Sequence, residues 1–234
     1  MAGELTTTSY AILGLLAVRP WTTYELAQQM DRAIGDFWPR TRSKLYEEPK
    51  KLVAHGLARA RPGQVGNRPR TVYSITAKGR RALAAWLPTP SEAPQLEFAG
   101  LLKVFFAENG SKADLLRTLD EVRRWTEEQA RSGAEICRGY LAGEGPFPER
   151  LPWLILCGQV LDDFVVAMGD WADWATDVVH TWPEDIRRAS PDLASLERMA
   201  QRNEAYTRAA DRRRGSALDR SAAALPPGDH WSEL

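Results

Sequence analysis

The sequence predicts a mainly α protein with a mixed N-terminal part and an all-helical C-terminal part. Apolar residues recur at helical spacing through most of the 234 residues. Between Leu57 and Ile75 the period changes to two, as in a pair of strands flanking a turn rich in proline and glycine. Pro88, Pro90 and Pro94 then mark a linker, and only helical patterns follow it.

The first two helices of the N-terminal part are marked by their ends. Residues 11–18 form an apolar stretch with one helical face, and Pro20 ends it. Thr22 and Glu25 have the spacing of a capping box, in which each side chain binds the other residue's backbone N–H. The second helix is therefore expected to begin there and to reach about Met30.

A third helix is expected over much of residues 42–55, because Gly56 is a residue type that commonly follows a helix. Glu47, Glu48 and Pro49 fall inside it. A proline inside a helix costs about 3 kcal/mol and removes one hydrogen bond. The sequence therefore predicts either a kink in this helix or a separate tight turn at its start.

The hairpin follows the third helix. Residues 57–61 alternate like a strand, residues 62–69 have turn chemistry throughout, and residues 71–75 form the returning strand. Thr76 is expected to cap a fourth helix that runs to about Leu87. The hairpin is basic and carries Arg59, Arg61, Arg68 and Arg70.

Three helices, a two-stranded wing and a further helix form a winged helix-turn-helix. Such a module places a helix in the major groove, about 12 Å wide, while the hairpin reaches the backbone or minor groove. The charge distribution agrees, since residues 1–90 carry 14 Lys and Arg against 6 Asp and Glu, and the remainder carries 17 against 25. The expected partner is double-stranded DNA; the alternative is a solvated basic surface.

The candidate DNA contacts lie on the second and third helices and on the hairpin. Residues early in the third helix are expected at base edges, and Lys50 and Lys51 at phosphates. The full set is Tyr24, Arg40, Thr41, Arg42, Ser43, Lys44, Tyr46, Lys50, Lys51, Arg59, Arg61, Asn67, Arg68 and Arg70.

The C-terminal part is expected to hold helices over residues 96–108, 112–141, 154–179 and 192–213. The predicted organisation is a DNA-binding domain (1–88), a linker (89–95), a helical dimerisation and effector domain (96–214) and a disordered tail (215–234). On the helix over residues 154–179, apolar residues form a stripe that must bury against another helix of the same chain or against a second subunit. We favour the second subunit, and hence a homodimer. The stripe is Leu154, Leu161, Val165, Met168, Ala172, Ala175 and Val179.

Nine tryptophans also need a role. Trp153, Trp171 and Trp174 are candidates for an aromatic pocket that takes a flat small-molecule effector. The alternative is packing in the core and at the dimer contact, because aromatic residues at helical spacing usually pack.

Other chemistry finds little support in the sequence. No glycine loop lies between a strand and a helix, and no Ser/His/Asp or Cys/His arrangement can be argued, so no enzyme, cofactor or metal site is expected. Cys137 and Cys157 form no metal spacing and are expected to be reduced thiols. Without a signal peptide or a run of eighteen apolar residues, a cytoplasmic protein without membrane contact is expected.

Residues 5–87 resemble the PadR family of bacterial transcriptional regulators. The resemblance rests on the order and spacing of several short pieces, among them Ala11-Ile12-Leu13-Gly14-Leu15-Leu16, Tyr24-Glu25-Leu26-Ala27, Trp38-Pro39, Leu45-Tyr46 and Tyr73-Ser74-Ile75-Thr76-Ala77-Lys78-Gly79. The second half is similar to the longer, virulence-activator-type C-terminal region of that family. The resemblance implies a dimer paired through C-terminal helices, and repression that a small molecule or signal relieves.

The sequence thus predicts a homodimeric repressor that binds an inverted-repeat operator. The alternative is a winged-helix protein-interaction module that no longer binds DNA. Glu47, Glu48 and Pro49 in the recognition helix are the hint for that alternative.

Overall fold

In a computed structural model, the protein is described for residues 4–35, 37–39, 41–65 and 68–223. The chain divides into two compact units, Met1–Glu97 and Phe98–Leu234.

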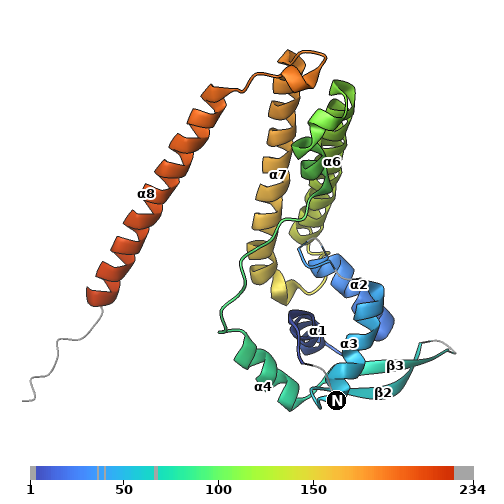
Figure 1. The fold of residues 1–234 in the computed structure, drawn as a ribbon. Helices are drawn as coiled ribbons and strands as arrows, with labels where there is room; N and C mark the ends of the chain where they lie inside the picture. Colours follow the sequence, from blue (N-terminus) through green and yellow to red (C-terminus); the bar gives the residue numbers. More distant parts are fainter. Residues whose placement is uncertain (1–3, 36, 40, 66–67, 224–234) are drawn as a thin grey trace, which may run out of the picture. The chain divides into compact units, whose positions relative to one another are not determined.

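The first unit contains helices and one small sheet (Figure 1). Its elements, in chain order, are α1 (Thr7–Val18), β1 (Trp21–Thr22), α2 (Thr23–Ile34), α3 (Arg42–Ala54), β2 (Ala58–Val65), β3 (Arg68–Ile75) and α4 (Ala77–Trp86). The predicted mainly α fold with an N-terminal winged helix-turn-helix is confirmed.

The helix starts follow their predicted caps. Thr22 Oγ1 accepts a hydrogen bond from Glu25 N at 3.2 Å, and Glu25 Oε2 accepts one from Thr22 N at 2.8 Å. Thr76 Oγ1 accepts from Gly79 N at 3.0 Å and begins α4. Gly56 follows α3 with a positive φ of 70°, a conformation that side chains other than glycine rarely adopt.

The sheet differs from the two-stranded wing that the sequence predicted. It has three antiparallel strands in the order β1-β3-β2, with Trp21 of β1 opposite Tyr73 of β3. β1 is only two residues long, too short for an alternating pattern to reveal it. The predicted turn over 62–69 was also too long, because β2 and β3 pair from Ala58 and Ile75 out to Val65 and Arg68. Pro62 can lie in β2 because β2 is at the edge of the sheet, and Pro69 lies in a part of β3 that β1 does not reach.

A closed apolar core fills the first unit. Ile12, Leu13 and Leu16 of α1 are fully buried together with Leu26 of α2 and Leu52 of α3. The core polar groups are satisfied, since Trp21 Nε1 donates to the carbonyl of Leu15 at 2.8 Å. These contacts hold α3 and the hairpin against the same apolar core.

The second unit is helical. Its elements are α5 (Ala99–Phe105), η1 (Ala107–Asn109), α6 (Lys112–Leu141), η2 (Pro148–Arg150), α7 (Leu151–Thr181), η3 (Ile186–Arg188) and α8 (Leu193–Ala223). α6 and α7 lie side by side and run in opposite directions (Figure 1). The helix expected over residues 96–108 is divided between α5 and η1, and α8 continues beyond its expected end at Arg213. The residues of the predicted tail beyond Ala223 lie outside the described residues.

At its C-terminal end the apolar stripe of α7 packs within the chain, which corrects the predicted dimer contact for these residues. Ala175 and Val179 form a core cluster with Leu115 and Leu119 of α6. Val165, like Leu154, Leu161 and Met168 on the same stripe, is half-buried, whereas the opposite side of the helix is exposed. Helical periodicity showed that this stripe is buried but could not identify the partner.

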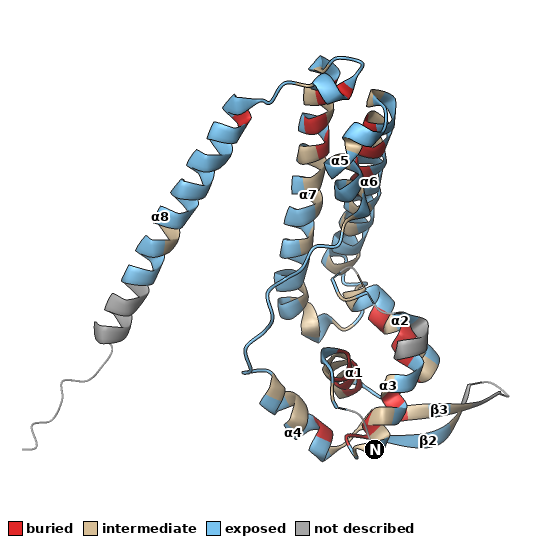
Figure 2. Ribbon diagram, in the orientation of Figure 1, coloured by how far each residue is buried: buried red, intermediate tan, exposed pale blue. Residues whose placement is uncertain are grey.

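A different face of α7 remains uncovered (Figure 2). Leu156 is 71% exposed and Val160 is 68% exposed. The segment Pro148–Thr181 is long and apolar enough to cross a membrane, by length and composition alone. This property was not predicted from the sequence, because Asp162 and Asp163 interrupt the apolar run.

Candidate nucleic-acid interface

Three arginines share one face of the hairpin. In the strand register Arg59 is opposite Ser74, Arg61 is opposite Val72 and Gly63 is opposite Arg70. Opposed residues of an antiparallel pair point to the same side, and every second residue along a strand does so as well. Arg59, Arg61 and Arg70 therefore point to the same side of the sheet; we call this surface the arginine face.

The other side of the hairpin faces the core. Ala58 and Tyr73, on the alternate positions, are buried. Burying this side fixes the strand register, because a slip of one residue would turn the arginines inward. The core therefore determines where the arginine face points.

Tyr24 extends the arginine face onto α2. The Arg70 guanidinium lies 5.7 Å from the centre of the Tyr24 ring, within cation–π range. Gln28 Nε2 donates a hydrogen bond to the Tyr24 hydroxyl oxygen at 3.1 Å. Gln28 was absent from the predicted contacts; its position one turn after Tyr24 was the available signal. The structure thus brings two predicted residues, Tyr24 and Arg70, together.

α3 runs without interruption from Arg42 to Ala54, with Pro49 inside it. The predicted separate tight turn is therefore absent from this part of the chain. Pro49 is fully buried, so its ring contributes to packing where its nitrogen cannot donate a hydrogen bond. Tyr46, on the preceding turn, is 39% exposed and remains available at the surface.

The two glutamates of α3, Glu47 and Glu48, form hydrogen bonds and ion pairs inside the first unit. The buried Ser9 hydroxyl donates to Glu48 Oε2 at 2.7 Å, and Lys51 Nζ lies 3.8 Å from Glu48 Oε1. Glu47 Oε1 accepts a hydrogen bond from Lys50 Nζ at 3.0 Å. Each glutamate is therefore paired with the lysine three residues later, and α3 carries little net negative charge at this point.

Lys50 and Lys51 differ as candidate phosphate contacts. Lys50 is exposed, and its hydrogen bond with Glu47 raises the pKa of its ammonium group, so it stays charged. Lys51 Nζ donates to the carbonyl of Glu4 and is only 21% exposed. The structure places Lys51 under the N-terminal segment rather than with the exposed candidates.

Some predicted contacts cannot be placed. Arg40 and Asn67 lie outside the described residues, as do the side chains of Arg42, Ser43, Lys44 and Arg68. Thr41 is exposed at the N-cap position of α3.

The three tryptophans proposed as an effector pocket are not brought together. Trp171 packs against the α6–α7 core and meets the Phe98 ring edge-on at 6.3 Å, whereas Trp174 is exposed. Trp153 lies 18 residues before Trp171 on the same helix, roughly 27 Å away at a rise of 1.5 Å per residue. These residues therefore do not line one pocket.

Taken together, three helices, a short strand and a basic hairpin define the first unit as a winged-helix protein. Residues 12–85 match the model of the transcriptional regulator PadR-like family. The chain thus carries the domain of the PadR-like family of transcriptional regulators, as its sequence resemblance predicted.

Two curated relatives match part of the chain. The probable transcriptional regulator Rv1176c of Mycobacterium tuberculosis is 35% identical over 82 residues, 35% of this chain and 43% of the relative. The negative transcriptional regulator PadR of Bacillus subtilis is 32% identical over 101 residues, 42% of this chain and 54% of the relative. The chain spans about half the length of these relatives.

Solved structures share the fold over a longer stretch. Bacillus subtilis PadR in complex with operator DNA aligns with a TM-score of 0.65 and 20% identity, covering 74% of this chain and 99% of that one. The same protein in complex with p-coumaric acid aligns with a TM-score of 0.59 and 19% identity, covering 75% and 99%. At these identities the alignments show the fold alone.

Proposed function

We propose that this protein is a transcription regulator that binds double-stranded DNA as a homodimer and represses at an inverted-repeat operator. The arginine face carries the proposal. Three guanidinium groups on one side of a hairpin, with Tyr24 beside them, suit the phosphate backbone next to a groove occupied by α3. Bacillus subtilis PadR, described as a negative regulator and solved with operator DNA, gives the fold a precedent for this use.

The protein-interaction alternative rested on Glu47, Glu48 and Pro49, and the structure gives each of them another explanation. Glu48 binds Ser9 and Lys51, Glu47 binds Lys50, and Pro49 packs in the core. None of the three has to be explained by a loss of DNA binding. The proposed function has no catalytic step and requires a cytoplasmic protein.

The arginine face can be tested by measuring binding to the DNA upstream of the protein's own gene at several salt concentrations. We expect Arg59→Gln with Arg61→Gln to lower the slope of log affinity against log salt by about two units, because each arginine neutralises about one phosphate. Arg80→Gln with Arg81→Gln on α4 is the matched control and should leave the slope unchanged. An equal slope in wild type and the hairpin variant would count against the proposal.

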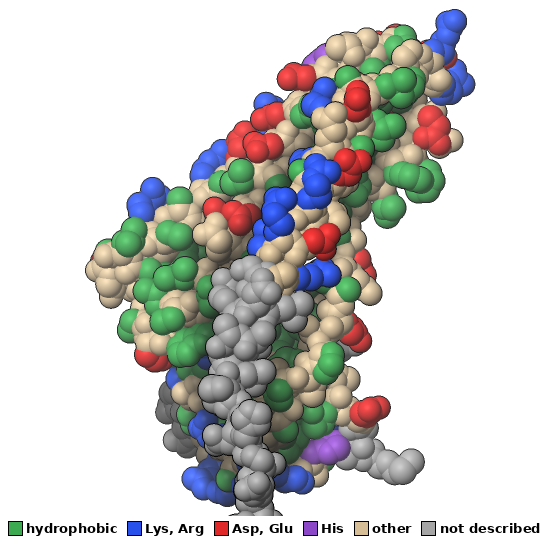
Figure 3. Space-filling model, turned by 90° about the vertical axis from the view of Figure 1, so that its left-hand side faces the viewer, with side chains coloured by type: hydrophobic (Ala, Val, Ile, Leu, Met, Phe, Trp, Pro, Cys, Tyr) green, Lys and Arg blue, Asp and Glu red, His purple; other side chains and the backbone are tan. Residues whose placement is uncertain are grey.

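The homodimer is supported by two uncovered helices of complementary character. α7 carries five aspartates and no lysine or arginine. The described side chains of α8 carry six exposed arginines against Glu197, Glu204 and Asp211, among apolar residues such as Leu196 and Met199, which are 58% and 43% exposed (Figure 3). An apolar acidic surface and an apolar basic one can cover each other across two copies of the chain. Pairing would also give each operator half-site its own α3.

An effector is the remaining element of the proposal. Bacillus subtilis PadR is described in complex with p-coumaric acid, so a protein of this fold binds a small molecule. For this chain the release of DNA by a small molecule is proposed by analogy with that protein.

A further inference from the structure

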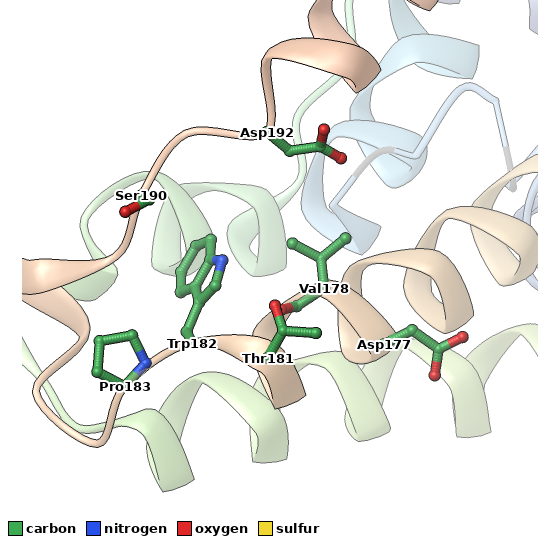
Figure 4. Close-up of a pocket in the computed structure, with 7 residues that line it drawn as sticks. All are labelled: Asp177, Val178, Thr181, Trp182, Pro183, Ser190 and Asp192. Carbon is green, nitrogen blue, oxygen red and sulfur yellow. The ribbon is translucent and has the colours of Figure 1, made fainter.

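Polar side chains that converge from different elements mark a binding site more clearly than a cavity does alone. The cavity of about 430 Å³ at the end of α7 shows no such convergence, because Asp177 and Asp192 stand apart and point away from its aromatic wall (Figure 4). In the first unit, by contrast, Gln28 and Arg70 both reach Tyr24, one from α2 and the other from β3.

The strand register places Tyr24 beside the hairpin. Thr22 of β1 is opposite Val72 of β3, so two positions further out in this antiparallel pair residue 24 is level with residue 70. Tyr24 lies there on the first turn of α2 and is 49% exposed. The Arg70 guanidinium therefore meets the Tyr24 ring, at 5.7 Å from its centre, without leaving the arginine face.

The hydrogen bond from Gln28 decides what the Tyr24 hydroxyl can still do. Gln28 lies one helical turn after Tyr24, and its Nε2 donates to Tyr24 Oη at 3.1 Å. A phenol hydroxyl has one proton to donate and lone pairs that accept. Gln28 uses a lone pair, and no described residue accepts a hydrogen bond from Tyr24. The hydroxyl proton is therefore kept for an acceptor outside the described part of the chain.

The charges around this hydroxyl favour an anionic acceptor. Arg70 is in contact with the ring, and the other two arginines of the arginine face follow along β2. Glu25, the acidic residue next to Tyr24, binds Thr22 in the capping box and lies 3.5 Å from Arg19. A phosphate oxygen of a nucleic-acid backbone has the charge and the lone pairs that this position suits.

We infer that Gln28 is a positioning residue for DNA binding, which orients the Tyr24 hydroxyl so that its proton is donated to a backbone phosphate beside Arg70. The inference rests on the proposed function, because the phosphate belongs to the duplex. Gln28 acts through Tyr24 and does not itself bind DNA. The hydroxyl is uncharged, so its contact adds affinity without releasing a counterion and without reading a base.

The test measures the affinity of the full chain for a mixed-sequence duplex and for the DNA upstream of its own gene, at several salt concentrations. Tyr24→Phe keeps the ring beneath Arg70 and should weaken binding about tenfold on both duplexes, with the salt slope unchanged. Gln28→Met keeps the length and helix propensity of the side chain but cannot donate, and should weaken binding about threefold. Arg70→Gln, which removes a charge, should instead lower the salt slope by about one unit.

Combining two substitutions separates positioning from any other role of Gln28. If Gln28 acts through the Tyr24 hydroxyl, Gln28→Met should cause no further loss of affinity in the Tyr24→Phe background. Gln95→Met removes another exposed glutamine of the first unit and should bind as the wild type does. Circular dichroism should show the same helix content in every variant, because all three side chains are exposed.

Three results would each overturn the inference: wild-type affinity in Gln28→Met, a further loss in the Tyr24→Phe background, or a loss confined to the upstream DNA. The last result would make Gln28 a base contact. All three leave the wild type bound to DNA and the proposed function intact. Failure of the wild type to bind either duplex would instead remove the proposed function, and the inference with it.

Discussion

The two units bury their apolar residues to very different extents. Among the described residues, 18 of the 23 large hydrophobic side chains that are exposed belong to the second unit and 5 to the first. In the first unit the core is closed around α1, whereas in the second unit α6 covers only one side of α7. A contiguous exposed apolar surface of this kind marks an interaction site. The first unit therefore encloses its core by itself, whereas the second unit leaves apolar residues exposed, which the proposed homodimer would cover.

The strongest test of this difference replaces two exposed residues of α7. Leu156→Lys with Val160→Lys should convert the protein to a monomer that remains helical, because lysine is tolerated in water but not beneath an arginine-bearing helix. We expect the dimer to weaken by roughly a thousandfold or more, since each buried unpaired charge costs several kcal/mol. Light scattering and circular dichroism measure the two properties.

The matched control places two lysines four residues apart on the exposed side of α6, as Glu128→Lys with Ser132→Lys, and should leave assembly unchanged. A full-strength dimer in the α7 variant would show that another surface pairs the subunits. Recovery of the wild-type protein as a monomer on lipid vesicles would instead assign the apolar face of α7 to a membrane.

A smaller effect is expected inside the first unit, at the hydrogen bond between Ser9 and Glu48. Ser9→Ala should lower the free energy of unfolding by about 1–3 kcal/mol, because a shielded carboxylate loses a donor and the Thr6 backbone N–H loses its acceptor at the start of α1. The loss should be the same at all protein concentrations, since the contact lies within one unit. Chemical unfolding monitored by fluorescence gives the value.

Glu47→Gln is the control for the Ser9 variant, because it breaks an exposed ion pair and should leave the stability almost unchanged. If Ser9→Ala were as mild as this control, Glu48 would not depend on its buried donor, and α3 would be positioned by packing alone.

The smallest effect concerns pH and compares the capping boxes of the two units. Burial raises the pKa of Glu25, but hydrogen bonds from Thr22 and the nearby Arg19 outweigh it and lower the pKa overall. Hydrogen bonds from Ser111 lower the pKa of Asp114 at the start of α6. A carboxyl whose folded pKa is depressed stabilises above its unfolded pKa and loses that contribution as pH falls through the folded value.

Both boxes should therefore weaken in acid below about pH 4 and be unaffected at neutral pH. Carboxyl titration by NMR should give a midpoint below 4.5 for Glu25 and below 3.8 for Asp114. A midpoint at or above the ordinary value for either residue would contradict the hydrogen-bonding described for that box.

Local signals in the sequence predicted the helix starts well, and for physical reasons. The Thr22–Glu25 box and the Thr76 cap are complete within four residues, so no distant contact is needed to recognise them. β1 escaped prediction because two residues cannot display a period. The outer part of the hairpin escaped because its prolines favour turns; Pro62 is compatible with a strand at the sheet edge, and Pro69 lies where β1 does not pair with β3.

The candidate site was predictable as a set of residue types but not as a surface. The sequence supplied Arg59, Arg61 and Arg70, yet their common side follows from the register that the core imposes. The sequence could not show that Lys51 is turned away from the exposed candidates, because its contact with the carbonyl of Glu4 joins residues 47 positions apart. The same limit applies to α7, where the pattern identified a buried stripe but not the helix that buries it.

The edge position of Pro62 has a consequence for solubility. An open strand edge offers unpaired backbone groups to any other chain, and edge-to-edge pairing of that kind leads to aggregation. Pro62 removes a donor from β2, and a proline ring on an edge obstructs an incoming strand. Exposed Arg59 and Arg61 add charge repulsion between like hairpins. The wing can therefore project into solvent without becoming a template for sheet growth when molecules crowd together.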